Sequence, residues 1–342
     1  MAKLLEFTNR GIFCPQANIY IDPWRPVDMA IITHAHSDHA RRGSNSYLAH
    51  KLSVPIMKYR LGTDISAEGI EYNRTVNVNG VNISLHPAGH IPGSSQVKLE
   101  FKGEIAVVSG DYKLADDGLS QPFEFVKCNT FVSESTFGLP VYKWKRQEEI
   151  FNEINNWWRS NKAKGKVSVL CGYSLGKAQR ILYNLDRSIG NIFGHGAVTI
   201  INDIMINEGV NLPSINRVSA AYLKKDYEGA MIIAPPSVIG NPWLRKFDPY
   251  SLGNASGWMN IRGAKRRQAL DIGFALSDHA DWNELNTAIK ETGAEKIFVT
   301  HGYTSVYVKW LLENGYDAEE LDTKFVGENP DEEINENEIE KL

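Results

Sequence analysis

The feature that most constrains the fold is a short apolar segment that ends in a dense group of metal-binding side chains. Residues 29–32 (Met-Ala-Ile-Ile) are typical of a buried strand, and the next seven residues read Thr-His-Ala-His-Ser-Asp-His. Side chains two residues apart in an extended segment point the same way, so His34 and His36 can bind one ion together. Asp38 and His39 follow where the chain would turn into a helix, and they are better placed for a second ion.

The composition is that of a globular chain and excludes several classes of protein. At 342 residues, with 42% hydrophobic and 23% charged residues, the chain is long enough for two domains. No apolar run approaches a membrane span and residues 1–6 lack a signal-peptide core, so a cytoplasmic protein without a membrane partner is expected. Cys14, Cys128 and Cys171 are an odd, widely spaced set, which argues against a disulfide framework.

The net charge of −4 is unevenly distributed. From Asp317 onward the sequence holds eleven acids and two lysines, a net charge of −9, so residues 1–316 carry +5. A mildly basic body permits a phosphate-rich substrate without requiring one. The end of the acidic segment, residues 328–342, is poor in apolar residues and is expected to be disordered.

Two predicted β-hairpins lead to further candidate ligands. Residues 76–85 alternate apolar and polar around an Asn-Gly turn signal, and they precede a loop in which glycines and prolines surround His90. His90 therefore suits a third ligand for the first ion. Residues 96–108 form the second hairpin, which is followed by Asp111. A carboxylate can bridge two ions, which no histidine can do, although an isolated aspartate after glycine is more often a turn residue.

More strand ends carry the same kinds of side chain. The predicted strands 131–133, 273–276 and 297–300 lead to Glu134, His279 and His301. Loops at strand ends bring distant residues together in sheet proteins, so these residues are expected to join the first group. Six histidines and three acids gathered in this way indicate a dinuclear hydrolytic centre.

The candidate ligands divide between two divalent ions, with zinc expected and manganese compatible. We assign His34, His36 and His90 to one ion, Asp38, His39 and His301 to the other, and Asp111 to both. Two ions about 3.5–4 Å apart would convert a bridging water to hydroxide near neutral pH. Asp22 follows the predicted strand 18–21, where it would hold an imidazole in the correct tautomer or, alternatively, cap a helix or turn.

Glu134 and His279 have no metal role in this assignment. A carboxylate that holds an imidazole is the usual arrangement for protonating a leaving oxygen, so this pair is expected to act as the general acid. Considered alone, His279 at a helix start would be better explained as a cap for its neighbours. We expect Asp38, His279 and Glu134 to be the catalytic residues.

From about residue 142 the predicted helices and strands begin to alternate along the sequence. Residues 148–161 are predicted to form an amphipathic helix, and residues 166–171 a strand. Further strands are expected at residues 198–201 and 230–234. This alternation of helix and strand continues for roughly 125 residues and predicts a small α/β domain of its own.

The order of these motifs resembles that of the metallo-β-lactamase superfamily. HxHxDH is followed by a loop histidine, Gly-Asp, Glu-Ser-Thr, a long α/β insertion, Ser-Asp-His-Ala-Asp and Thr-His-Gly, which is similar to the β-CASP branch. Residues 173–179 are similar to the helix opening of that branch's inserted domain. The resemblance implies an α/β fold, namely an αββα metallo-β-lactamase sandwich with an inserted α/β β-CASP domain. The implied boundaries are residues 1–141 and 269–327 for the sandwich, 142–268 for the insertion and 328–342 for the tail.

A closer likeness is to the bacterial ligase-associated DNA exonucleases. Four stretches carry it, residues 22–28, 234–237, 255–259 and 277–282. Within the branch, which contains nucleases such as Artemis, RNase J and the pre-mRNA cleavage endonuclease, Glu134, His279 and His301 resemble motifs A, B and C. Motif C tends to be histidine in RNA-acting members and valine in eukaryotic DNA-acting ones, so His301 leaves an RNA substrate open.

The resemblance implies a dinuclear-metal-dependent nuclease that hydrolyses DNA phosphodiester bonds. The implied enzyme is a 5′-to-3′ exonuclease in DNA repair, associated with an ATP-dependent DNA ligase and a helicase. A metal-bridging hydroxide would attack phosphorus while His279, with Glu134, protonates the leaving oxygen. The alternatives are an RNA-processing β-CASP ribonuclease and a small-molecule metallo-hydrolase, a class that shares HxHxDH.

Several residues are candidates for contact with the substrate. They are Lys113, Ser135, Lys177, Ser237, Arg262 and Arg266. The basic run at residues 262–267 lies beside Trp258, so the run would grip phosphates while the aromatic ring stacks on a base. The alternative is that this run is a solvated face, and that Lys113 pairs with a surface acid.

Overall fold

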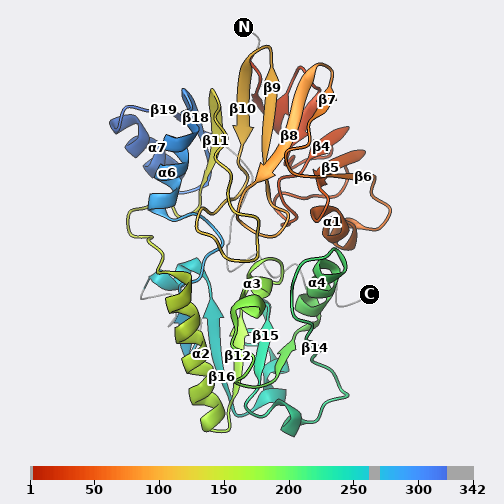
Figure 1. The fold of residues 1–342 in the computed structure, drawn as a ribbon, viewed down its shortest axis with the longest axis vertical. Helices are drawn as coiled ribbons and strands as arrows, with labels where there is room; N and C mark the ends of the chain where they lie inside the picture. Colours follow the sequence, from red (N-terminus) through yellow and green to blue (C-terminus); the bar gives the residue numbers. More distant parts are fainter. Residues whose placement is uncertain (1–2, 262–269, 322–342) are drawn as a thin grey trace. The chain divides into compact units, whose positions relative to one another are not determined.

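The computed structural model describes residues 3–261 and 270–321, and it shows an α/β protein made of two compact units (Figure 1). Among these residues the first unit holds those up to 143 and from 279 onward, and the second holds those from 144 to 278. Arg262, Arg266 and the tail at residues 328–342 lie outside the described residues. None of the helices in the described part is long and apolar enough to cross a membrane.

The first unit contains two sheets, and the apolar segment lies in the middle of the first. In order across that sheet the strands are β1 (Glu6–Thr8), β2 (Gly11–Cys14), β3 (Ile19–Ile21), β4 (Met29–Ile31), β5 (Ser46–His50) and β6 (Ala67–Ile70). β1 to β3 are antiparallel and β3 to β6 are parallel. Helix α1 (Ser53–Leu61) follows β5. β4 is therefore the predicted strand, and its neighbours on both sides bury it.

The second sheet contains both predicted hairpins, β7–β8 and β9–β10. Its strands, in order, are β19 (Asp317–Glu320), β18 (Lys296–Gly302), β11 (Thr130–Ser135), β10 (Glu104–Val108), β9 (Ser95–Phe101), β8 (Val81–Pro87) and β7 (Val76–Val78). Asn79 and Gly80 have φ values of 52° and 86°, and Lys102 and Gly103 have 51° and 86°. Positive φ at both central residues is the requirement of a tight two-residue hairpin turn, so both hairpin predictions are confirmed.

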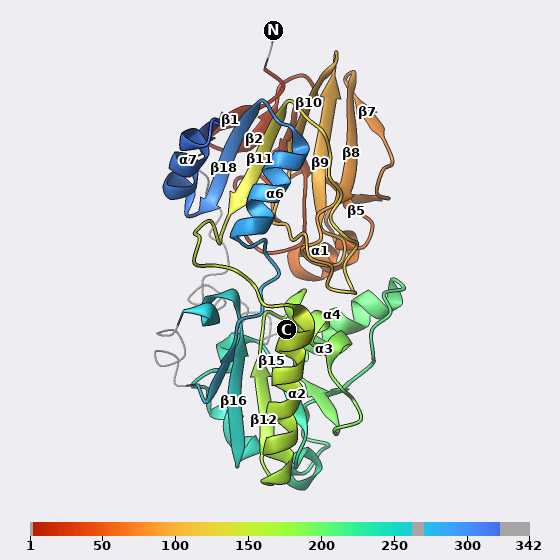
Figure 2. The same cartoon turned by 60° about the vertical axis from the view of Figure 1, so that its left-hand side comes forward.

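The two sheets of the first unit pack against each other through one apolar core. Adjacent residues of a strand face opposite sides, and here Val108 and Val132 belong to the core between the sheets. Val107 and Phe131 point to the other side, against α6 (Trp282–Thr292) and α7 (Thr304–Glu313) (Figure 2). The second sheet is thus covered on both faces.

The second unit is built on a parallel sheet. In order, its strands are β14 (Asn216–Arg217), β13 (Ile192–Gly194), β15 (Met231–Ala234), β12 (Val167–Cys171), β16 (Tyr250–Ala255) and β17 (Ile272–Phe274). The helices α2 (Gln147–Ala163), α3 (Lys177–Asn184) and α4 (Gly196–Asn207) pack on one face through a cluster that includes Trp158 and Leu170. The 3-10 turns η1 (Lys224–Tyr227), η2 (Pro236–Val238) and η3 (Pro242–Phe247) pack on the other, and η4 (Gly257–Asn260) follows β16.

One strand prediction in this unit is wrong. Residues 198–201 lie inside helix α4 rather than in a strand. The side chain of His195 accepts a hydrogen bond from Ala197 N at 3.2 Å and so caps the helix start. Val198 and Met205 are buried at helical spacing, which the β-branched composition of the segment concealed. The predicted helix at 148–161 and the predicted strand at 230–234 correspond to α2 and β15.

Because α6 and α7 bury one face of the second sheet, removing a buried aromatic side chain there should cost much more stability than removing an exposed one. Phe131 is 0% exposed, so Phe131→Ala should lower the free energy of unfolding of the first unit by about 3–5 kcal/mol. Phe125 is 46% exposed, and Phe125→Ala is the matched control, with a loss below about 1 kcal/mol. Urea unfolding of both variants provides the comparison. Equal losses would contradict the packing described here.

Candidate metal centre

Asp22 organises the loop that carries the first four candidate ligands. It follows β3, and its Oδ1 accepts a hydrogen bond from Thr33 N at 2.8 Å. Its Oδ2 accepts one from Thr33 Oγ1 at 2.5 Å and lies 2.7 Å from His39 Nδ1. A carboxylate at Nδ1 leaves Nε2 of His39 to face the site. Asp22 therefore contacts an imidazole, as predicted, and it also holds Thr33, eleven residues further along the chain.

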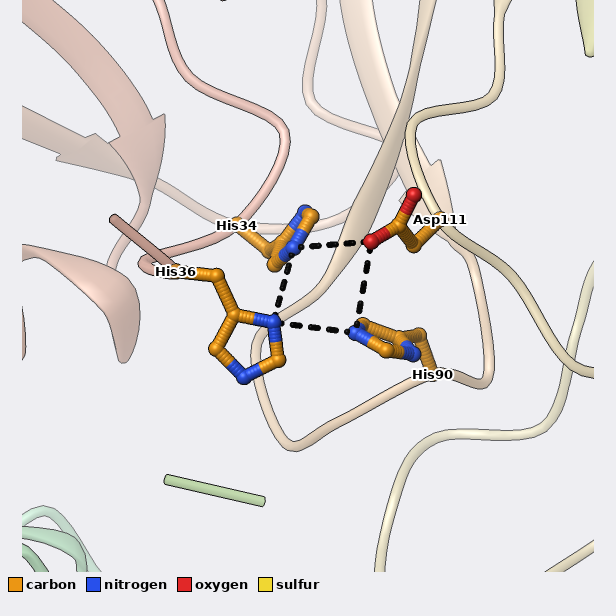
Figure 3. A group of neighbouring side chains, drawn as sticks. All are labelled: His34, His36, His90 and Asp111. Atoms are coloured by element: carbon orange, nitrogen blue, oxygen red, sulfur yellow. Dashed lines mark hydrogen bonds and ion pairs between the residues drawn. The ribbon is translucent and has the colours of Figure 1, made fainter. Parts of the chain in front are cut away.

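Four donor atoms surround a common point in the first group of side chains (Figure 3). His36 Nδ1 lies 3.1 Å from His34 Nε2 and 3.2 Å from His90 Nε2. Asp111 Oδ2 lies 3.4 Å from His34 Nε2 and 3.8 Å from His90 Nε2. A tetrahedral zinc ion with bonds of about 2.0–2.1 Å to nitrogen holds its donors about 3.3–3.4 Å apart. The donor set and its spacing fit one ion.

A second group shares Asp111 with the first. His39 Nε2 lies 3.5 Å from Asp111 Oδ2, and His301 Nε2 lies 2.6 Å from Asp111 Oδ1. Oδ2 of Asp111 thus lies near imidazoles of both groups and Oδ1 is contacted by the second group, so this one carboxylate can serve both as a bridging ligand. Asp38 Oδ2 is 3.5 Å from His39 Nε2. Asp38 is beside this group but outside the set of described donors that lie within 4.8 Å of one another.

Gly110 and Gly302 allow the loops of this second group to approach their neighbours. Gly110 has a φ of 58°, and a Cβ there would lie 2.6 Å from Thr33 Oγ1. Gly302 has a φ of 90°, and a Cβ there would collide with the carbonyl oxygen of Ser135. Both positions require glycine for conformation and for space. The Gly-Asp and His-Gly pairs are therefore part of how the ligands are placed.

The imidazole of His301 is oriented by its neighbours. Ser135 Oγ donates a hydrogen bond to the His301 carbonyl at 2.7 Å, which fixes the backbone. Thr300 Oγ1 lies 2.9 Å from His301 Nδ1, so Nε2 is the atom that faces Asp111. Thr33 Oγ1 occupies the same place beside His34 Nδ1, at 3.1 Å. Ser135 was expected to contact the substrate, but it is buried in this backbone contact.

Glu134 and His279 form a buried pair at the end of β11. His279 Nδ1 lies 2.9 Å and 3.1 Å from the two carboxylate oxygens of Glu134. Glu134 Oε1 also accepts a hydrogen bond from Tyr112 N at 2.8 Å, and the ring of Phe137 meets the imidazole edge to face. His279 Nδ1 is 4.0 Å from Asp111 Oδ2, so the pair adjoins the metal groups. These three acidic and basic side chains are themselves close enough to hold an ion.

Burial and neighbouring charges shift the pKa values of the candidate ligands in directions that favour the binding of cations. Burial and neighbouring imidazoles lower the pKa of His34 and lower that of His90 further, which keeps both rings neutral and able to bind a metal. Burial acts to raise the pKa of Asp111, but the imidazoles of His39, His301 and His279 outweigh it and hold that pKa well below its usual value.

His39 behaves in the opposite way. Burial acts to lower its pKa, but the carboxylates of Asp38, Asp111 and Asp22 outweigh it, so the pKa of His39 is well above its usual value. Three carboxylates around one imidazole attract positive charge to this position. A divalent ion bound by the second group would supply this positive charge.

Lys113, Lys177 and Ser237 were also predicted to contact the substrate, and both lysines lie near acidic side chains. Lys113 is buried, and its Nζ lies 3.7 Å from Glu284 Oε2. In the second unit, Lys177 is buried with its Nζ 3.7 Å from Asp278 Oδ2. Ser237 is half-buried in η2.

The hydroxyl and backbone groups that orient the ligands were not among the predicted site residues. Thr33, Thr300 and the N–H of Tyr112 have this function in the structure. A signal for two of them was present, because a Thr-His pair stands at the end of both β4 and β18.

Comparison with known proteins adds family relationships to this geometry. No family model matches the chain. It is 27% identical over 312 residues to a probable DNA ligase of Opitutus terrae, covering 91% of this chain but only 30% of that protein. It is 22% identical over 378 residues to a probable RNase MJ4 of Methanocaldococcus jannaschii, with 86% of each chain covered. An RNase aCSPSF2 of Saccharolobus solfataricus is 27% identical over 273 residues, which is 68% of this chain and 55% of that one.

A solved structure shares the fold. A protein of unknown function from Enterococcus faecalis superimposes with a TM-score of 0.60 and 12% identity, over 87% of this chain and 80% of that one. The curated relatives that match most of the chain carry nuclease or ligase names. These names, and the histidines and acids that converge on Asp111, agree with the resemblance to the β-CASP branch of the metallo-β-lactamase superfamily.

Proposed function

We propose that the protein is a dinuclear-metal-dependent nuclease that hydrolyses DNA phosphodiester bonds, acting as an exonuclease. The observation that carries this proposal is the position of Asp111, whose two oxygens are contacted by imidazoles of two separate groups. The proposed architecture is an αββα sandwich with an inserted β-CASP domain. The end of the insertion, predicted at residue 268, moves to residue 278, because β17 (Ile272–Phe274) pairs with β16 in the second unit's sheet.

Seven side chains would hold the two ions. His34, His36 and His90 would bind one, Asp38, His39 and His301 the other, and Asp111 both. When bound, the ions would supply Lewis acidity and an activated water for attack on phosphorus. Asp22 would keep His39 in the tautomer that binds metal, because its carboxylate contacts Nδ1.

His279 would complete the hydrolysis by protonating the leaving group. Hydrolysis forms a bond between the water oxygen and phosphorus and breaks the bond from phosphorus to the leaving oxygen. A proton from His279 Nε2 passes to that oxygen, while Nδ1 donates to Glu134, whose charge stabilises the imidazolium. Tyr112 N holds Glu134 in place for this task.

The choice of DNA rests on a relative whose match extends over most of this chain. That relative is named a probable DNA ligase, and the match covers 91% of the chain. Its name supports a role at DNA ends beside a ligase. The proposal further includes 5′-to-3′ polarity, a place in DNA repair and a helicase as a functional associate, as the sequence resemblance implies. The alternative is an RNA-processing ribonuclease, which the relatives named as RNases and the histidine at position 301 favour.

Replacement of the shared carboxylate tests the dinuclear centre. Asp111→Asn should reduce DNA cleavage to background and release at least one of two bound metal equivalents, because the amide supplies no charged bridge. Asp116→Asn, an exposed aspartate in the following loop, is the control and should retain both ions and full activity. Metal content is measured by plasma mass spectrometry on dialysed protein. Full activity of Asp111→Asn would refute the proposal.

His279→Ala separates proton transfer from metal binding. We expect kcat on DNA to fall by about 10²–10⁴-fold, the usual contribution of a positioned acid, with two metal equivalents retained. Glu134→Gln should cause a smaller loss in the same assay. If His279→Ala loses a metal equivalent, then His279 is a ligand and the assignment is wrong.

Removal and replacement of metal, with matched substrates, tests the substrate class. Chelator-treated protein should be inactive and should recover activity with zinc or manganese. DNA and RNA oligonucleotides of the same sequence, labelled at either end, should show stepwise loss of 5′ nucleotides from DNA. Faster cleavage of RNA would establish the ribonuclease alternative, and faster turnover of lactams or thioesters would establish a small-molecule hydrolase.

A further inference from the structure

One buried arginine binds both ends of the second unit's chain segment. Arg180 lies in α3 and is 4% exposed. Its Nε donates to Gln147 Oε1 at 2.7 Å, and Gln147 begins α2 shortly after the chain leaves the first unit. Its Nη1 donates to Ser277 O at 2.7 Å and to Asp278 Oδ1 at 2.9 Å. These are the last two residues before the chain returns to the first unit.

The contact between Arg180 and Asp278 is a buried hydrogen bond between two charged side chains. Asp278 is 2% exposed, and its second oxygen lies 3.7 Å from Nζ of the buried Lys177. Charge-assisted hydrogen bonds are shorter and about twice as strong as neutral ones. Only the planar fork of arginine presents Nε and Nη donors in fixed directions, which a lysine ammonium cannot reproduce. The backbone at residues 277–278 is therefore held by a group that has no simple substitute.

The residue after Asp278 is His279, and the chain beyond it is also fixed. Ala280 N donates to Tyr112 O at 2.6 Å, and Trp282 N donates to Tyr142 O at 3.1 Å. His279 is thus the single residue between a segment held within the second unit and a segment held within the first. Its side chain contacts Glu134, so a shift of its backbone would change the direction of Nε2.

We propose that Arg180 is a positioning residue for His279. It holds Ser277 and Asp278 so that the imidazole delivered by the next residue presents its proton to the leaving oxygen. The inference rests on the proposed function of His279 as general acid. It also assigns a reaction role to α3, a helix of the second unit that carries none of the candidate metal ligands.

The test compares substrates that do and do not need a proton on the leaving group. Arg180→Lys keeps the charge but loses the fork, and Arg187→Lys, an exposed arginine of the same unit, is the matched control. His279→Ala is the reference. Each variant is assayed with a DNA oligonucleotide and with bis(4-nitrophenyl) phosphate, whose nitrophenolate leaves without protonation. Metal content and melting temperature are measured in parallel.

We expect Arg180→Lys to lower kcat on DNA by about 10- to 100-fold, with an unchanged KM and two metal equivalents. Its kcat on the nitrophenyl ester should change by less than about 3-fold, and Arg187→Lys should match the parent protein on both. Equal losses on the two substrates, or no loss on DNA, would overturn the inference. If His279→Ala itself shows no difference between the substrates, the proposed role of His279 fails instead.

A second variant keeps the test decisive if Arg180→Lys does not fold. Asp278→Asn preserves the size of the side chain and removes the charge that Nη1 contacts. It should reproduce the selective loss on DNA, more weakly, because the bond from Arg180 to Ser277 O remains. A parent-like kcat on DNA for this variant would count against the positioning role.

Discussion

The carboxylate of Asp111 is the interaction on which the centre depends. Five imidazoles lie near it, and they come from chain segments far apart in the sequence. Histidines alone would leave a buried group of donors with nothing to hold them together. A single ionised aspartate draws them to one point, and the glycine before it allows the close approach to Thr33. The surrounding sheets determine where that point lies, because the ligands follow the ends of strands from both.

The same constraint explains why the site is suited to cations. Buried ionisable groups are stable only when they are paired or coordinated. The carboxylates that surround His39 favour positive charge there, while the crowded imidazoles of His34 and His90 disfavour it. A cation bound between these groups would supply the positive charge that the carboxylates favour, and the neutral imidazoles would coordinate it. The charge pattern and the donor spacing thus lead independently to the same conclusion.

Local rules were sufficient for much of the fold and for the members of the centre. The two hairpins followed from their turn residues, and β4 followed from its apolar run, because these signals depend on neighbours in sequence. The strand predicted at 198–201 was wrong, because β-branched residues suit a helix when a cap and a buried face are supplied. Tertiary packing also buries Lys113 and Lys177, which were predicted to contact the substrate. No sequence pattern reveals that a lysine will be buried beside Glu284 or Asp278.

The hydrogen bond from Trp282 N to Tyr142 O has a consequence for the modular history of such a chain. It brings together, within the first unit, the two points between which the second unit's segment is spliced. A segment whose ends meet in this way imposes little strain on its host, whatever its length or content. The host carries the candidate metal ligands on its own, and the splice falls next to His279. Exchange of the spliced segment would therefore leave the candidate metal ligands in the host, while it would replace the residues that precede His279.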